Sequence, residues 1–192
     1  MLPGLTDPVL DSQLIFRATL DAMAHPGRIV DVSGPFEGPA PLDPATVAVL
    51  LTLADLDTRL WLDAAAATSA VIDYLKFHCG CPVVMSPSMA RFAVVADATA
   101  LPPLTEFSGG SDEEPHLSTT IIVQVAALNG GTGRRLSGPG IRDHAILGID
   151  GVPDRFWVEL ASNHRRFPCG VDVILTAGTV LAALPRTVRV ED

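Results

Sequence analysis

Four segments of the chain carry apolar residues at helical spacing, and the first begins with a clear start signal. Asp7 can cap a helix with its carboxylate, and Pro8 suits the first turn. Pro26-Gly27 then ends the pattern. The apolar positions between these limits are Leu10, Leu14, Ala18 and Ala22. We expect this stripe to face the core, so that aspartate at Leu14 should unfold the domain.

Three further helices follow from the same pattern. Asp43-Pro44 repeats the start signal and opens an apolar helix that runs to Leu53. The third helix is expected between residues 68 and 80, and the fourth between residues 153 and 166. Leu51 is expected in the core, and aspartate there should unfold the domain as well.

Runs of β-branched and apolar residues predict strands between and after these helices. The predicted strands cover residues 28–32, 59–62, 83–85, 91–96, 119–128, 134–137, 171–176 and 179–184. Asn129-Gly130 has the composition of a hairpin turn between two of them. Residues 97–118 are rich in proline, glycine and acidic side chains, and they predict a long loop.

Helices interspersed with strands favour an α/β fold. The late hairpins add antiparallel pairs to the parallel ones that crossover helices create, so the sheet should be mixed and covered on both faces. Neither an internal repeat nor a linker interrupts the pattern. We therefore expect residues 1–192 to form a single domain.

Composition narrows the functional classes. The chain has 22 acidic and 13 basic side chains and a formal net charge of -9, which argues against nucleic acid or an anionic membrane as a partner. No apolar run reaches the roughly 20 residues that span a bilayer, and the N-terminus lacks the features of a signal peptide. The three cysteines fit reduced thiols. These features predict a cytoplasmic protein.

Two local motifs suggest ligand chemistry but match no established pattern. The glycine-rich residues 130–135 could bind phosphate, yet they lack the Gly-Lys-Ser/Thr of a phosphate-binding loop and suit a hairpin turn better. His78, Cys79 and Cys81 offer soft metal ligands within four residues. Their spacing is not that of a zinc site, and cysteine is also a common core residue, so we expect no metal.

A free-standing enzyme is the alternative that these residues leave open. A thiol hydrolase would need a cysteine and a histidine brought together by the fold, with Cys169 as one candidate nucleophile. A transferase that depends on pyridoxal phosphate would need a Schiff-base lysine, and Lys76 is the only lysine in the chain.

Several segments taken together resemble the PhnH family of the carbon-phosphorus lyase pathway. No single segment is diagnostic, but their order and spacing span nearly the whole chain. The segments are Gln13 with Phe16-Arg17, Ala22-Met23-Ala24-His25-Pro26-Gly27, Leu50-Leu51-Thr52-Leu53-Ala54-Asp55, Asp57-Thr58, Leu60-Trp61-Leu62, Phe77-His78, Gly138-Pro139-Gly140-Ile141, Phe167-Pro168-Cys169-Gly170-Val171-Asp172 and Pro185-Arg186-Thr187.

The resemblance implies a three-layer α/β/α sandwich, similar in topology to pyridoxal-phosphate-dependent transferases but without their cofactor. It implies a homodimer that acts with the G, I and J subunits of the carbon-phosphorus lyase core complex. The reaction implied is the formation of alpha-D-ribose 1-alkylphosphonate 5-triphosphate from ATP and an alkylphosphonate. In this step the phosphonate displaces the adenine of ATP, and the resemblance associates the step with the G, H, I and L proteins. In the family this chemistry is usually placed on the I subunit, so the resemblance gives this chain no catalytic residue.

Four residues of the matching segments have the chemistry of an anion pocket. Arg17, His25 and Arg186 could bind phosphate-like oxygens, and Asp172 could orient an arginine instead. Each of them could equally be part of a structural ion pair or cap. On the binding interpretation, alanine at Arg186 should leave the fold intact and affect function alone.

Overall fold

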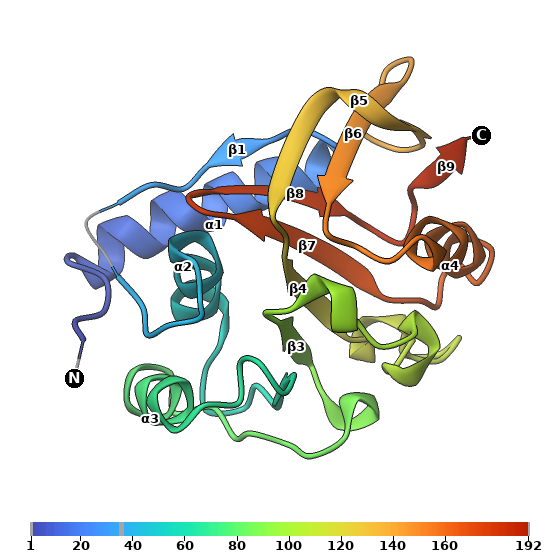
Figure 1. The fold of residues 1–192 in the computed structure, drawn as a ribbon. Helices are drawn as coiled ribbons and strands as arrows, with labels where there is room; N and C mark the ends of the chain where they lie inside the picture. Colours follow the sequence, from blue (N-terminus) through green and yellow to red (C-terminus); the bar gives the residue numbers. More distant parts are fainter. Residues whose placement is uncertain (1, 35–36, 192) are drawn as a thin grey trace.

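The computed structural model describes residues 2–34 and 37–191 and forms a mixed α/β structure (Figure 1). Its helices are α1 (Pro8–Ala24), α2 (Pro44–Leu53), α3 (Ser69–His78) and α4 (Arg155–His164). Its strands are β1 (Val30–Asp31), β2 (Leu60–Leu62), β3 (Phe92–Val95), β4 (Thr120–Gln124), β5 (Ala127–Ser137), β6 (Ala145–Asp150), β7 (Asp172–Ala177), β8 (Val180–Leu184) and β9 (Arg189–Glu191). Short 3-10 helices are η1 (Pro87–Met89), η2 (Ala98–Ala100), η3 (Leu104–Glu106) and η4 (Pro115–Leu117).

The main sheet is mixed, as expected. Its six strands lie in the order β1-β8-β7-β4-β3-β2. The strands β2, β3, β4 and β7 pair in parallel, whereas β8 is antiparallel to both β7 and β1. A second, antiparallel sheet has the order β6-β5-β9.

Each face of the main sheet has its own hydrophobic core. Because successive side chains of a strand point to opposite faces, Val94 and Ile122 pack with α1, α2 and α3, whereas Ala93 and Ile121 pack with α4 and the second sheet. Figure 1 shows the three helices grouped on one side of the sheet and α4 with the second sheet on the other. The two cores share one sheet, and a single domain over residues 1–192 stays a prediction.

Two helices begin with a side-chain cap, and the cap at Asp7 was predicted from the sequence. The Asp7 carboxylate accepts hydrogen bonds from the amides of Val9 and Leu10 at 3.0 Å, and the Thr68 hydroxyl accepts one from the amide of Val71 at 3.2 Å.

Asp43 has a different role at the start of α2. Its carboxylate does not bond to the amides of its own helix. It accepts instead from the amide of Gly178 at 2.9 Å, in the turn between β7 and β8. This bond ties the start of α2 to the main sheet.

The predicted core stripe of α1 is confirmed at Ala22, which is buried, and at Ala18, which packs against the core, but it is wrong for the two leucines. Leu10 and Leu14 are exposed, with 66% of Leu14 accessible, while Ile15, Thr19 and Ala22 are buried. The buried face of α1 therefore combines one large residue, Ile15, with the smaller Thr19 and Ala22. Leu51 is only partly buried, and the fully buried part of α2 ends at Leu50.

Three strand predictions also need correction. Residues 83–85 do not form a strand, although Val83 makes an isolated bridge to Leu60. The run 119–128 is divided between β4 and β5. Asn129-Gly130 is not a hairpin turn but part of β5, whose register with β6 shifts between Gly130 and Arg134.

Asn163 on α4 is a buried polar residue that holds the start of β7. Its side-chain amide donates to the carbonyl of Val171 and accepts from the amide of Val171, both at 2.9 Å. Replacing Asn163 with alanine leaves both buried backbone groups without this partner. We expect the free energy of unfolding to fall by about 2 to 3 kcal/mol, as measured by urea denaturation. Alanine at Asn129, whose bond to Asp150 is exposed, is the control and should cost less than about 0.5 kcal/mol.

Candidate functional site

Arg186 lies just after β8 and is the centre of a polar cluster that also contains Asp172, another of the predicted site residues. Its guanidinium forms an ion pair with Asp172 at 2.5 Å, at the first position of β7. It also donates to the carbonyls of Pro115 at 2.8 Å and Pro168 at 3.2 Å, and to the hydroxyl of Ser118 at 2.5 Å. The side chains of Arg186 and Asp172 are only 14% and 15% exposed. We call these five residues the Arg186 clasp.

The clasp leaves Arg186 without a free donor. A guanidinium has five N–H bonds. In Arg186 the Nε group donates to Asp172 Oδ1 at 3.2 Å, Nη1 donates to the two carbonyls, and Nη2 donates to Asp172 Oδ2 and Ser118. All five bonds therefore have protein acceptors, and Arg186 joins β7, β8, η4 and the segment after α4 instead of presenting its charge to a ligand.

Arg17 and His25 lie on α1 and at its end, outside the clasp. Arg17 is on the exposed face of the helix and makes no hydrogen bond or ion pair with other described residues. His25 Nδ1 contacts the Asp21 carboxylate at 2.9 Å, and Arg28 binds the same carboxylate at 3.0 Å. The hydrogen bond from Arg28, followed by the charges of Arg28 and His25, lowers the pKa of Asp21. The four predicted residues thus divide into the Asp172–Arg186 pair, the His25 cluster and an isolated arginine.

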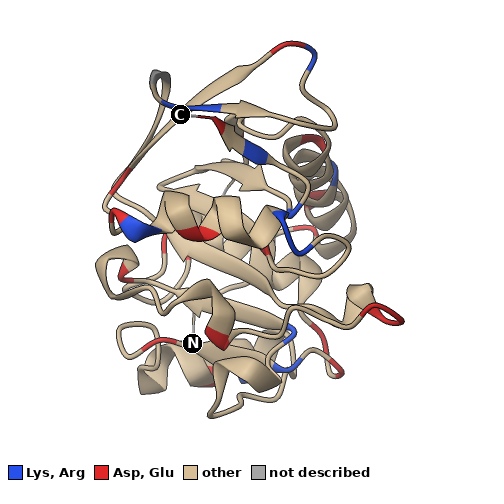
Figure 2. Ribbon diagram, turned by 90° about the vertical axis from the view of Figure 1, so that its right-hand side faces the viewer, with Lys and Arg blue, Asp and Glu red and all other residues tan. Residues whose placement is uncertain are grey.

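Two adjoining pockets open beside the clasp and share Phe167 and Thr187. The first has a volume of about 350 Å³ and is lined by Pro115, His116, Phe167, Pro168, Asp172, Pro185, Arg186 and Thr187. The second has a volume of about 330 Å³ and is lined by Gly138, Pro139, His164, Phe167, Thr187 and Arg189. In the view of Figure 2, most basic positions lie in the half of the molecule that contains the C-terminus.

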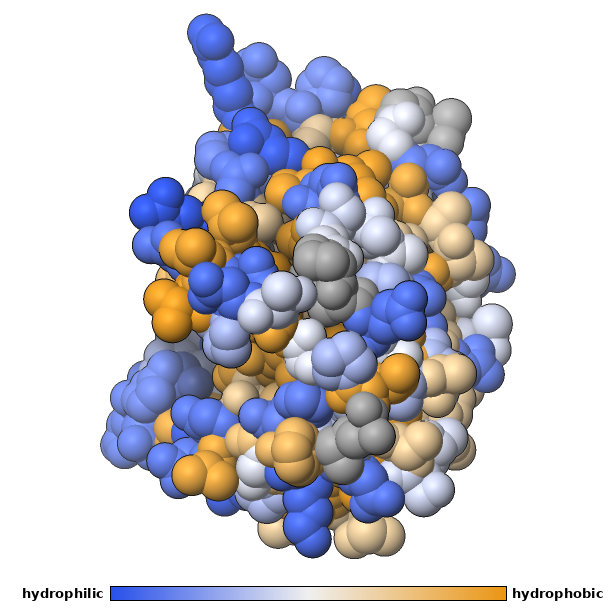
Figure 3. Space-filling model, turned by 90° about the vertical axis from the view of Figure 1, so that its left-hand side faces the viewer, coloured by the Kyte–Doolittle hydropathy of each residue, from blue (hydrophilic) through white to orange (hydrophobic). Residues whose placement is uncertain are grey.

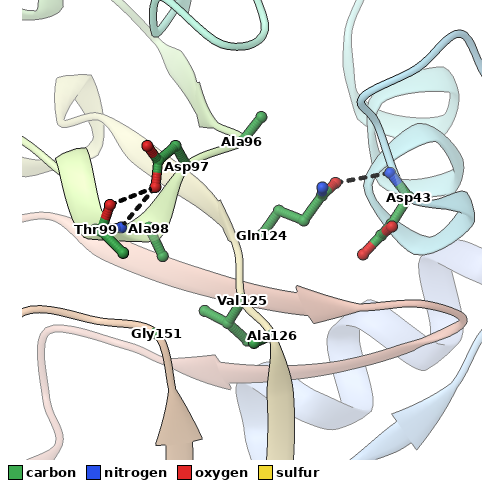
Figure 4. Close-up of a pocket in the computed structure, with 9 residues that line it drawn as sticks. All are labelled: Asp43, Ala96, Asp97, Ala98, Thr99, Gln124, Val125, Ala126 and Gly151. Carbon is green, nitrogen blue, oxygen red and sulfur yellow. Dashed lines mark hydrogen bonds between the residues drawn. The ribbon is translucent and has the colours of Figure 1, made fainter.

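A third pocket, of about 410 Å³, lies at the carboxyl ends of β3 and β4 (Figure 4). Its residues are Asp43, Ala96, Asp97, Ala98, Thr99, Gln124, Val125, Ala126 and Gly151. Ligands of open α/β sheets commonly bind at this edge. The position alone makes it a candidate binding site.

The polar groups of the edge pocket are already bonded within the protein. Gln124 Oε1 accepts from the amide of Asp43 at 2.7 Å and the hydroxyl of Thr46 at 3.1 Å, and Nε2 donates to Pro41 at 2.9 Å. On the other side, Asp97 accepts from the amide and hydroxyl of Thr99 at 3.0 and 2.6 Å, which lowers the pKa of Asp97. The pocket has two carboxylates and no nucleophile or cation, so it does not suit a phosphate or phosphonate.

The sequence candidates for stand-alone chemistry are not assembled into a site. Lys76 is exposed on α3 and lines none of the three pockets described above. Cys79 and Cys81 are buried and contact each other, which raises the pKa of Cys79 and lowers that of Cys81. His78 instead contacts the carbonyl of Leu2 at 3.2 Å. In residues 2–34 and 37–191, no group of three or more His, Cys, Asp or Glu side chains could hold a metal ion.

Cys169 lies beside an acid and not beside a histidine. Its Sγ is 3.4 Å from Asp112 Oδ1, and partial burial together with this carboxylate raises the pKa of the thiol. A raised pKa keeps the thiol protonated at neutral pH and makes it a poor nucleophile. We expect Asp112→Asn to lower that pKa and to increase alkylation of Cys169 by iodoacetamide severalfold at pH 7. The pH dependence of the rate, with Cys169→Ser identifying the site, measures the effect; an unchanged profile would contradict it.

Arg189 was not singled out in the sequence, although it lines the second pocket beside the clasp together with His164. The signal at Arg189 was the polar and apolar alternation of residues 187–191, which is typical of a short strand but was overlooked. Gln124 was missed for another reason, because its partners Asp43 and Thr46 are about 80 positions away in the sequence.

Known proteins match this chain over nearly its whole length. The family model for the bacterial phosphonate metabolism protein PhnH matches residues 3–191. A Rhizobium meliloti protein, described as alpha-D-ribose 1-methylphosphonate 5-triphosphate synthase subunit PhnH, is 40% identical over 188 residues, which are 98% of this chain and 94% of that protein. A Stutzerimonas stutzeri protein named provisionally as the C-P lyase subunit HtxG is 32% identical over 178 residues, which are 93% of this chain and 85% of that protein.

These matches confirm the resemblance found in the sequence. They cover both cores, the clasp and all three pockets. Within the described residues, no helix is long and apolar enough to cross a membrane. The chain belongs to the PhnH family of bacterial phosphonate metabolism proteins.

Proposed function

We propose that the chain is the H subunit of a ribose 1-methylphosphonate 5-triphosphate synthase in carbon-phosphorus lyase catabolism of phosphonates. The step is the formation of alpha-D-ribose 1-alkylphosphonate 5-triphosphate from ATP and an alkylphosphonate. The name of the 40% identical relative supports this assignment, because the similarity extends over nearly the full length of both chains. On this view the chain works in the cytoplasm as part of a complex.

The exposed apolar face of α1 is the observation that carries the subunit interpretation. It consists of Val9, Leu10, Leu14, Phe16 and Leu20, which are 45% to 76% exposed. Several large apolar side chains exposed on one helix mark an interaction site more often than a single exposed one. Figure 3 shows apolar residues reaching the surface in patches between hydrophilic ones on the side where α1 begins. We propose that such surfaces bind a second copy of this chain, in a homodimer, and the G, I and J subunits.

The arrangement of the polar residues also favours a subunit over a free-standing enzyme. A free-standing transferase would need Lys76 in a pocket, but Lys76 lines none of the three pockets described above. A thiol hydrolase would need Cys169 next to a base, but its sulfur contacts the carboxylate of Asp112 instead. We also propose that the mixed sheet has the three-layer arrangement and topology of pyridoxal-phosphate-dependent transferases without binding their cofactor. The exposed position of Lys76 supports the second part of that proposal.

An omission experiment tests the proposed function. The G, I and L proteins are combined with ATP and methylphosphonate, with or without this chain, and phosphonate-dependent release of adenine is measured. We expect the rate to fall at least about 10-fold when the chain is omitted, and this chain alone to release none. Equal rates with and without the chain, or adenine release by the chain alone, would overturn the proposal.

A further inference from the structure

Three segments that resemble the PhnH family come together around the second pocket beside the clasp. Gly138-Pro139 follows β5, Phe167 follows α4, and Thr187 follows β8, yet all of them line one pocket of about 330 Å³. This volume is within the roughly 300 to 1,000 Å³ of small-molecule sites. We call it the Arg189 pocket. The convergence of three remote segments on a single cavity makes it a better candidate for a ligand site than the edge pocket.

The charged residue of this pocket is Arg189, and a hydrogen bond fixes its orientation. Arg189 Nε donates to His164 Nε2 at 3.1 Å. Because Nε of arginine is always a donor, His164 accepts there and carries its proton on Nδ1. That proton is donated to the carbonyl of Arg186 at 3.3 Å. The clasp therefore holds His164, and His164 in turn holds Arg189.

The terminal nitrogens of Arg189 differ from those of Arg186 in having no protein acceptor among the described residues. Arg189 also forms no ion pair with a described carboxylate, although it is exposed. Its remaining four N–H bonds present a fork that matches two oxygens of a tetrahedral anion. The neighbouring Thr187 adds a hydroxyl to the lining.

Much of the remaining lining of the pocket is apolar. Phe167 is 60% exposed although it is a large aromatic residue, and it forms the wall shared by both pockets beside the clasp. Pro139 lies in the lining of the same pocket. A ligand with an organic group would cover these side chains and remove apolar surface from water. An inorganic anion would gain nothing from them.

We propose that the Arg189 pocket binds an organophosphonate, with the phosphonate oxygens on the terminal nitrogens of Arg189 and the organic substituent on Phe167 and Pro139. This inference rests on the proposed function, because a pathway that consumes phosphonates supplies this class of ligand. It assigns substrate contact to this chain and replaces Arg186 by Arg189 as the anion-binding residue.

Binding to the full chain tests the inference directly. Phenylphosphonate is titrated into the purified protein, and binding is followed by isothermal titration calorimetry and by the ³¹P chemical shift. We expect saturable binding that Arg189→Ala weakens at least about 10-fold. Arg189→Lys should weaken it severalfold, because lysine keeps the charge but loses the fork. Arg134→Ala, which removes an exposed arginine from the same sheet but from different pockets, is the matched control and should bind normally.

The choice of ligand separates an organophosphonate site from a plain anion site. We expect phenylphosphonate to bind more tightly than methylphosphonate, and inorganic phosphate to bind weakest. Phe167→Leu should reduce the difference between the two phosphonates. The inference is overturned by absent saturation, by equal affinity in wild type and a folded Arg189→Ala variant, or by phosphate binding as tightly as phenylphosphonate. Thermal melting reports folding of each variant. If binding fails while the omission experiment still requires this chain, the site is wrong and the subunit function stands.

Discussion

Replacing Asp172 with alanine is expected to lower the free energy of unfolding by about 3 to 5 kcal/mol. Removing this carboxylate leaves the Arg186 guanidinium mostly buried and without its counter-charge, since only 14% of that side chain is exposed. It also removes the acceptor for the backbone amide of Arg186, at 2.8 Å. Urea denaturation at neutral pH measures the loss.

The exposed ion pair between Arg135 and Glu191 provides the matched control. Its side chains are 54% and 39% exposed, so Glu191→Ala should cost less than about 1 kcal/mol. Arg186→Ala should be strongly destabilising, contrary to the expectation from the sequence, because it leaves Asp172, Ser118 and two carbonyls without their donor. A loss at Asp172 no larger than the loss at Glu191 would show that the clasp is not a stabilising element.

Leu14→Asp is expected to prevent assembly with the partner subunits while leaving the chain folded. Because 66% of Leu14 is exposed, the free energy of unfolding should change by less than about 0.5 kcal/mol. A charge in the centre of an apolar interface should weaken association by at least about 100-fold. Circular dichroism melting and co-purification with the G, I and J subunits measure the two effects.

Two variants control for this result. Val158→Asp places the same charge on α4, at a residue that is 70% exposed. It should leave both folding and assembly unchanged. Leu50→Asp places it in the fully buried part of α2 and should unfold the chain. Normal co-purification of Leu14→Asp would remove α1 from the proposed interface.

Local signals in the sequence predicted the elements better than the faces they bury. The caps of α1 and α3 and the proline starts of α1 and α2 are short-range features, so they can be read directly. Which side of α1 faces the core depends on what packs against it. There Ile15, Thr19 and Ala22 are buried while Leu10 and Leu14 are exposed, and the spacing of the apolar residues alone did not indicate this.

The second sheet was the main omission of the sequence analysis. The strand β6 contains Gly148 in its interior, which weakens its strand pattern, whereas the alternation of residues 187–191, which includes β9, was overlooked. The long strand β5 was divided at Asn129-Gly130 because that pair has the composition of a turn. The missing β9 also explains why Arg189 was overlooked, since the register of β9 with β5 places it opposite Ser137, next to Gly138.

For the predicted site residues too, the sequence indicated the chemistry but not the contacts. Asp172 and Arg186 were chosen for their chemistry, and the structure brings them together as an ion pair. Whether an arginine binds a ligand or stabilises the fold depends on its acceptors, which come from η4 and from the segment after α4. Those contacts join residues 18 to 71 positions apart and cannot be read from the local sequence.

The most direct test of the central claim is to co-express this chain with the G, I and J subunits and to measure the mass of the purified species by size exclusion with light scattering. We predict one stable complex that contains this chain in stoichiometric amount. If the other subunits assemble while this chain elutes alone, it is not a subunit of the complex, and a free-standing enzyme becomes the better description.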